Sequence, residues 1–212
     1  MRARPDPALD ARPFVLAALA LGALAMRRRP SAFGRRVVLL VVALVAGPVL
    51  NLSYSLVQVK ALALAEWPPP GGSAAFLLAV GIPAFVLLFG NVYCGWMCPF
   101  GACQELAGEW GHAMGRGSAP DKERWRYARW LKFALLFGIV SALAFRPDVA
   151  VVAADPLLSV FSRGAGAAVR AFAGTMLALS IAYPRFWCRN LCPAGAFLSL
   201  LGRVALLRRW LP

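Results

Sequence analysis

The 212-residue chain is 60% apolar and only 15% charged, with a mean hydropathy of +0.66. This composition excludes an ordinary water-soluble domain, in which about a quarter of the residues are charged. It predicts an integral membrane protein, because several apolar runs approach the ~20 residues that cross a bilayer. The net charge of +14 does not call for nucleic acid, since the basic residues gather at the ends of the apolar runs, as in cytoplasmic loops.

We divide the chain into an N-terminal segment (1–34), a first hairpin repeat (35–118) and a second hairpin repeat with a basic tail (119–212). The N-terminal segment predicts a short transmembrane or interfacial helix, with a cleaved signal peptide as the alternative. The repeats predict an all-α integral membrane protein built from two transmembrane helical hairpins. Their four core spans are expected at residues 37–56, 74–93, 128–145 and 168–183.

The loops that are rich in Lys and Arg fall on one side of this layout, at residues 27–36, 98–132 and 185–209. The positive-inside rule makes that side cytoplasmic. We therefore expect a multi-pass protein of the bacterial-type inner membrane, with the cysteine-containing segments facing the cytoplasm.

Histidine is nearly absent, because His112 is the only one in the chain. A bis-histidine haem, a histidine-rich copper or zinc site and a Ser-His-Asp triad are thereby disfavoured. No pair of carboxylates indicates hydrolysis either, and Glu105 is interpreted as a capping or solvated acid. The chemistry that remains is that of five cysteines: Cys94, Cys98, Cys103, Cys188 and Cys192.

Four of these cysteines belong to an internal repeat. Residues 93–102 and 187–196 share the pattern aromatic-C-x-x-x-C-P-x-G-A, and the match continues to Leu106 and Leu200 and to Gly108 and Gly202. Each motif follows two expected spans, so the halves form a parallel repeat with a site between them. The repeat predicts that Cys94, Cys98, Cys188 and Cys192 meet near the cytoplasmic membrane surface.

The spacing inside each motif suggests how the cysteines are presented. Residues i and i+4 share one face of a helix, so each pair could act as one ligand unit. Pro99 and Pro193 should end or kink the helix at the second cysteine. Gly101 and Gly195 should permit close packing where the chain turns into the next helix. Cys103 has Phe197 as its counterpart and is expected to serve only in packing.

Several ligands suit four convergent thiolates. An iron–sulfur cluster is the first candidate, copper(I) or zinc is the second, and a redox-active dithiol is the third. The cysteines could also be small buried residues without a ligand. Because the usual signature C-x-x-C-x-x-C-x-x-x-C-P is absent, the residues alone leave these alternatives open.

At the two motifs the sequence resembles the NapH/NosR-type membrane ferredoxin-like proteins, which carry two C-x-x-x-C-P motifs. Residues 93–105 are similar to the NosR side, and the two-hairpin layout, including residues 155–159, is similar to the NapH membrane core. The resemblance covers about residues 35–204. It implies that Cys94, Cys98, Cys188 and Cys192 take the role of the family's motif cysteines, with a [4Fe–4S] cluster as the expected cofactor and copper as the alternative.

The resemblance also implies a function: a membrane-bound electron-transfer component linked to quinol, as a subunit of an oxidoreductase system rather than a stand-alone enzyme. Copper binding or reduction during metalloenzyme assembly is one alternative, and a cofactor-free membrane anchor for a redox partner is another. Relatives usually continue into a soluble region with cysteine runs for two clusters, which these 212 residues lack. We therefore expect a partner subunit with ferredoxin or flavin cofactors, besides the lipid bilayer and quinol.

Overall fold

The computed structural model describes residues 12–28, 31–66, 68, 74–116, 124–145, 160–161 and 166–204. All regular structure within these ranges is helical, which confirms the all-α part of the predicted fold. Residues 155–159 and the basic tail beyond residue 204 lie outside them. The helices are α1 (Arg12–Arg28), α2 (Ala32–Val41), α3 (Leu56–Ala63), α4 (Ala74–Phe76), α5 (Ile82–Phe89), α6 (Pro99–Ala113), α7 (Arg124–Phe145), α10 (Ala167–Ala182), α11 (Phe186–Asn190) and α12 (Pro193–Leu201), with π-helical turns η1 (Val42–Ala46), η2 (Leu77–Gly81) and η3 (Tyr93–Met97).

The prediction of an integral membrane protein with four core spans is wrong for this structure. Among the described residues, no helix combines the length and the apolar character that crossing a bilayer requires. The first expected span, 37–56, ends early because the chain turns at residues 47–50 and Asn51 takes a positive φ of 49°. A new helix, α3, then starts at Leu56, where Ser55 and Gln58 form a capping box.

The other expected spans fail for related reasons. The second is divided among α4, η2 and α5, and it ends at Gly90, whose φ is 84°. The fourth corresponds to α10, whose 16 residues fall short of the ~20 that a span needs. The 22-residue α7 begins with the basic sequence RWRYARWLK, which leaves its apolar run to residues 133–145.

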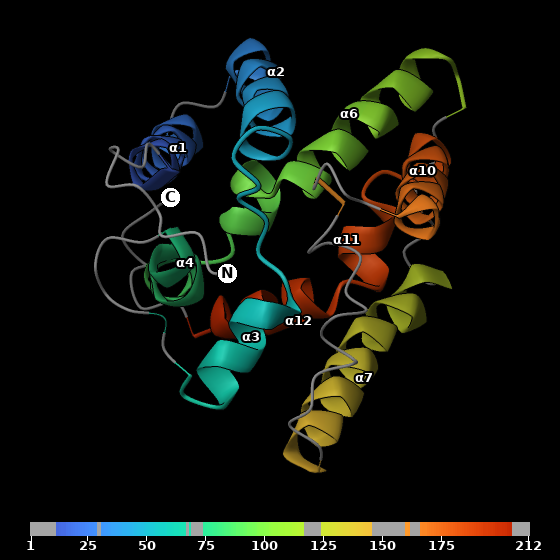
Figure 1. The fold of residues 1–212 in the computed structure, drawn as a ribbon. Coiled ribbons are helices and arrows are strands. Elements are labelled where there is room, and N and C mark those ends of the chain that lie inside the picture. Colours follow the sequence, from blue (N-terminus) through green and yellow to red (C-terminus); the bar gives the residue numbers. More distant parts are fainter. Residues whose placement is uncertain are drawn as a thin grey trace.

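The internal repeat appears in the fold as reciprocal packing. Helix α6 follows the first motif and lies between α2 and α10 (Figure 1). Helix α12 follows the second motif and packs against α7, α5 and α3. Since α5 precedes the first motif and α10 precedes the second, each helix that follows a motif packs on the helix that precedes the other motif.

Repeated glycines allow these helices to approach closely. A Cβ on Gly108 would lie 2.9 Å from Cβ of Pro184, and a Cβ on its counterpart Gly202 would lie 2.9 Å from the backbone nitrogen of Asn91. The closest approach is at Gly111, where a Cβ would lie 1.9 Å from the carbonyl oxygen of Ile181. Glycine is therefore required at these close contacts, which bring the two motifs together.

Candidate functional site

The second cysteine of each motif begins a helix. Cys98 and Cys192 are the N-cap residues of α6 and α12, with closely similar extended backbones (φ −73°, ψ 116° and φ −69°, ψ 110°). Pro99 and Pro193 take the first helical position, where a missing N–H is tolerated. The expectation that both cysteines of a motif share one helix face is therefore wrong, because the preceding helical turn ends before the second cysteine.

The glycine of each motif donates to the sulfur of that cysteine. Sγ of Cys98 accepts a hydrogen bond from the Gly101 N–H at 3.4 Å, and Sγ of Cys192 accepts one from the Gly195 N–H at 3.2 Å. A Cβ on Gly101 would also lie only 3.2 Å from the Cys94 carbonyl oxygen. Because these N–H groups stand at helix N-termini, both sulfurs are placed where a thiolate is stabilised.

All four motif cysteines line one small cavity between the repeats. The rest of its wall is aromatic or apolar, and includes Tyr54, Tyr93, Phe100, Ala194 and Leu198. The five cysteines all lie within the described residues, and none of them forms a disulfide. Cys103 lies elsewhere, on α6, where it packs against the cluster formed by Leu39, Val42, Ala43, Ala46 and Ala102.

Cys94, Cys98 and Cys188 differ in acidity according to their surroundings. A hydrogen bond from the Cys188 thiol, aided by the Gly101 N–H and the positive charge of Arg185, lowers the pKa of Cys98 to about 7 against the effect of burial. The same hydrogen bond and burial raise the pKa of Cys188 well above its ordinary value. Burial, together with the neighbouring Cys98, raises the pKa of Cys94 to about 12. Of these three thiols, Cys98 is thus the one most readily ionised.

A charged group covers the first motif. Glu105 on α6 accepts hydrogen bonds from Arg35, at 2.6 Å for Nη2, and is also paired with Arg185. Arg185 donates to the carbonyl oxygen of Gly95 at 2.9 Å, and the Arg35 guanidinium lies 4.7 Å from the Trp96 ring centroid. Sequence reasoning missed this group because the partners of Glu105 are 70 and 80 residues away in the chain.

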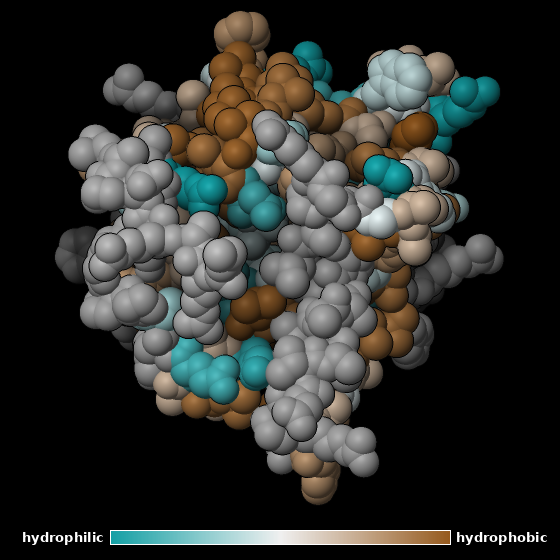
Figure 2. All heavy atoms as spheres, viewed as in Figure 1, coloured by the Kyte–Doolittle hydropathy of each residue, from teal (hydrophilic) through white to brown (hydrophobic). Residues whose placement is uncertain are grey.

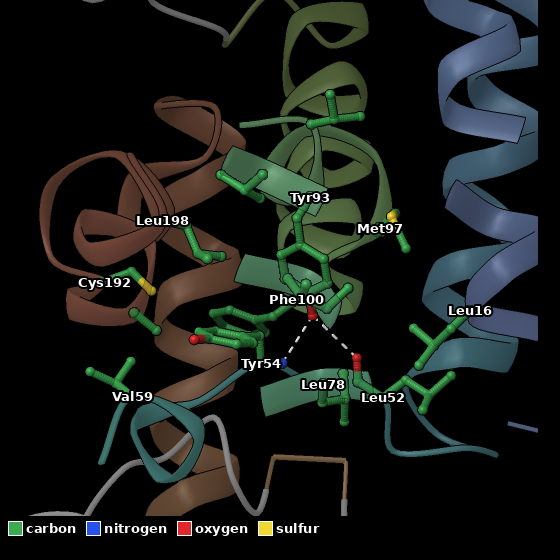
Figure 3. Close-up of a cluster of buried hydrophobic side chains, with 14 of the residues drawn as sticks. Leu16, Leu52, Tyr54, Val59, Leu78, Tyr93, Met97, Phe100, Cys192 and Leu198 are labelled. Carbon is green, nitrogen blue, oxygen red and sulfur yellow. Dashed lines mark hydrogen bonds between the residues drawn. The ribbon is translucent and has the colours of Figure 1, made fainter. Parts of the chain in front are cut away.

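Three buried polar side chains at the site were also missed. Tyr93 donates its hydroxyl to the Leu52 carbonyl at 3.2 Å and accepts from the Tyr54 N–H at 2.9 Å (Figure 3). The hydroxyl of Tyr54 is buried with no hydrogen-bond partner among the described residues. Gln104 is fully buried, and its Oε1 accepts from the Cys188 N–H at 3.4 Å, while its Nε2 has no partner in the same part of the chain.

These residues fit a [4Fe–4S] cluster. Four cysteine thiolates are its usual ligand set, one for each iron. Within the described ranges, no three Cys, His, Asp or Glu side chains are grouped so that they could hold a metal ion. The N–H groups on Cys98 and Cys192 and the unpaired Tyr54 hydroxyl are donors that suit a sulfur-rich anion.

Comparison with known proteins gives the same assignment. Residues 72–113 and 165–212, which hold the two motifs, match the 4Fe-4S binding domain family. The chain is 34% identical over 204 residues to "Protein NirI" of Paracoccus denitrificans, across 88% of this chain and 30% of NirI. It is 31% identical to "Putative electron transport protein YccM" of Escherichia coli K12 (74% of this chain, 44% of YccM) and 29% identical to "Methylamine utilization ferredoxin-type protein MauN" of Paracoccus denitrificans (69% and 50%). No solved structure matches.

The motifs and these relatives define an iron–sulfur protein. The chain belongs to the NapH/NosR-type family of ferredoxin-like proteins, and its cofactor is an iron–sulfur cluster, as the sequence predicted. It spans between 30% and 50% of the length of the three relatives described.

Proposed function

We propose that Cys94, Cys98, Cys188 and Cys192 together hold one [4Fe–4S] cluster between the two repeats. The observation that carries this proposal is that the four thiols, which come from two separate motifs, line a single cavity. A cluster bound there supplies a one-electron redox centre. The copper alternative has no comparable support among the relatives, whose family is described by 4Fe-4S binding.

The surrounding residues would hold and insulate this centre. The N–H groups of Gly101 and Gly195 orient the sulfurs of Cys98 and Cys192 and favour their ionised form. Buried Phe100 and Leu198, which are 2% and 1% exposed, exclude water from the cavity wall. Burial and hydrogen bonds to sulfur are the two features by which a protein sets the potential of such a centre.

We infer that the protein acts at the cytoplasmic side of a bacterial inner membrane. An apolar surface on α2 and η1 supports this location, and Figure 2 shows apolar side chains gathered over α2. Phe33 is 80% exposed and Leu44 is 65% exposed. Exposed apolar surfaces of this kind mark contacts with a membrane or another protein, and the basic composition suits an anionic lipid surface.

We further propose quinol as the electron donor and a partner subunit with ferredoxin or flavin cofactors as the acceptor. A groove of about 380 Å³ runs between α7 and α12 and is lined by Trp130, Phe133, Phe137, Leu200 and Arg203 among others. Its volume is within the range of small-molecule sites, which are mostly apolar with a few polar groups. The Arg203 guanidinium, 5.8 Å from the Phe133 ring centroid, is the cationic group at its edge.

The cofactor is tested by purifying the protein without oxygen and measuring iron, acid-labile sulfide and copper. We expect about four irons and four sulfides per chain, with an electron paramagnetic resonance signal that appears on reduction. A folded protein that takes up neither iron nor sulfide on reconstitution contradicts the proposal. If that protein instead binds copper tightly, and only with all four motif cysteines present, the copper alternative is supported.

The donor is tested separately by adding a short-chain quinol to the oxidised, loaded protein and following loss of its visible absorption. Trp130→Ala, in the groove, should slow this reduction. Trp110→Ala is the matched control, because Trp110 on α6 is similarly exposed, 60% against 67% for Trp130, and does not line the groove. Equal rates for both variants would contradict a quinol site in this groove.

A further inference from the structure

Tyr54 stands in an unusual place for a tyrosine hydroxyl. Its side chain lines the cavity of the four cysteines, and the residue is only 3% exposed. Within the part of the chain that the structure describes, its hydroxyl oxygen has no hydrogen-bond partner. A buried polar group that makes no hydrogen bond is costly, so such a group in a native fold calls for a partner that the protein chain itself does not provide.

The backbone holds Tyr54 firmly in this position. Its N–H donates to the Tyr93 hydroxyl at 2.9 Å, and the two rings meet edge to face with centroids 5.9 Å apart. The next residue, Ser55, caps α3 through the capping box with Gln58. The non-helical stretch at residues 51–55 therefore presents the Tyr54 ring to the cavity in a fixed orientation.

The direction of the ring identifies the partner. Figure 3 shows the hydroxyl end of Tyr54 turned toward the side of the cavity where Cys192 lies. Tyr93 lines the same cavity, but its hydroxyl already donates to the Leu52 carbonyl. Tyr54 is thus the lining tyrosine whose O–H is left to donate, and the sulfur-bearing side chains of the four cysteines line the same cavity.

We propose that Tyr54 is a positioning residue whose hydroxyl donates a hydrogen bond to a sulfur of the iron–sulfur centre, either a thiolate or an inorganic sulfide, and thereby raises the centre's reduction potential. The inference rests on the proposed function, since it needs a cluster held by the four cysteines. Reduction adds one negative charge to the centre, and a hydrogen-bond donor stabilises the more negative state more strongly.

The test compares Tyr54→Phe, which removes only the hydroxyl, with Tyr183→Phe as the control, because Tyr183 does not line the cavity. Both proteins are loaded without oxygen, and iron, sulfide and the midpoint potential are measured. We expect Tyr54→Phe to retain its cluster and to shift the reduction equilibrium constant about tenfold toward the oxidised state, or about 59 mV for one electron. Tyr183→Phe should leave the potential unchanged.

Two further measurements make the result specific. In D₂O, the reduced wild-type protein should show hyperfine coupling to an exchangeable deuteron that Tyr54→Phe lacks and Tyr183→Phe retains. Replacing Tyr54 with 3-fluorotyrosine keeps the hydroxyl, makes it a stronger donor and should raise the potential. This replacement also decides the matter if Tyr54→Phe does not retain the cluster.

The outcomes separate this inference from the proposed function. A loaded Tyr54→Phe protein with unchanged potential and unchanged deuteron coupling overturns the role of Tyr54 and leaves the four-cysteine site intact. An unchanged potential with 3-fluorotyrosine overturns that role as well. A wild-type protein that holds no cluster overturns the proposed function, and the role of Tyr54 with it.

Discussion

The two cysteine motifs share a backbone design and differ in what surrounds them. In both, the second cysteine caps a helix, its sulfur accepts a glycine N–H, and the helix that follows packs on the opposite repeat. The first motif is also covered by the ion group of Arg35, Glu105 and Arg185. At the positions equivalent to Arg185 and Glu105, the other repeat has the neutral residues Asn91 and Ser199.

This difference separates two tasks within the site. The helix caps and glycine N–H groups, which occur in both motifs, hold the sulfurs. The ion group, which covers only the first motif, makes one side of the cavity more positive than the other. Arg185 shows this directly, because its charge helps to lower the pKa of Cys98. Such an asymmetry would let one centre present different electrostatic surroundings to a donor and to an acceptor.

The largest expected effect comes from disrupting the close contact between α6 of the first repeat and α10 of the second repeat. Gly111→Ala would place a Cβ 1.9 Å from the Ile181 carbonyl oxygen, so α6 and α10 would have to move apart. We expect a loss of about 3 kcal/mol in the free energy of unfolding, measured by denaturant titration. Gly138→Ala on α7 is the control, because a Cβ there meets nothing within 4 Å, and it should be neutral or stabilising by about 0.5–1 kcal/mol. Equal losses of stability in the two variants would contradict the close packing of α6 against α10.

The ion group predicts the next effect. Glu105→Gln leaves two arginines beside a neutral carboxamide, at a position where the glutamate side chain is only 16% exposed. We therefore expect the free energy of unfolding to fall by about 2 kcal/mol. Glu109→Gln is the matched control on the same helix. Its ion pair with Arg36 is exposed and should contribute less than about 1 kcal/mol. A Glu105 variant as stable as the Glu109 variant would show that the ion group does not stabilise the first motif.

The smallest expected effect concerns the equivalent glycine contacts that each repeat makes with the other. Gly108→Ala and Gly202→Ala each bring a Cβ to 2.9 Å from an atom of the opposite repeat. Each should therefore destabilise the protein by about 1–2 kcal/mol, and the two losses should agree to about 0.5 kcal/mol. A large loss at one position with none at the other would mean that only one of the two reciprocal contacts supports the fold.

The sequence predicted the all-α class of the fold. Positions that recur in both halves, such as Gly108 and Gly202, occupy equivalent places at the reciprocal contacts. The expected spans failed because apolar composition does not show where a helix stops. A local signal was present, since Ser55 and Gln58 have the spacing of a capping box, which starts a helix inside the first expected span.

Other parts of the site could not be predicted from local patterns. Glu105 is held by arginines 70 and 80 residues away, and no short-range spacing indicates such pairs. The place of Tyr54 at the cavity depends on the turn at residues 47–50 and on the Tyr93 hydroxyl from another part of the chain. These contacts arise only when the two repeats pack together.

The central claim is that cysteines from both motifs hold one cluster, and iron and sulfide content per chain tests it most directly. Cys98→Ser and Cys192→Ser remove one sulfur from each motif, while Cys103→Ser removes a thiol that packs outside the cavity. We predict that each motif variant loses most of its iron and sulfide and that Cys103→Ser retains both. Full cluster content in either motif variant, or an equal loss in Cys103→Ser, would contradict a site shared by the two motifs.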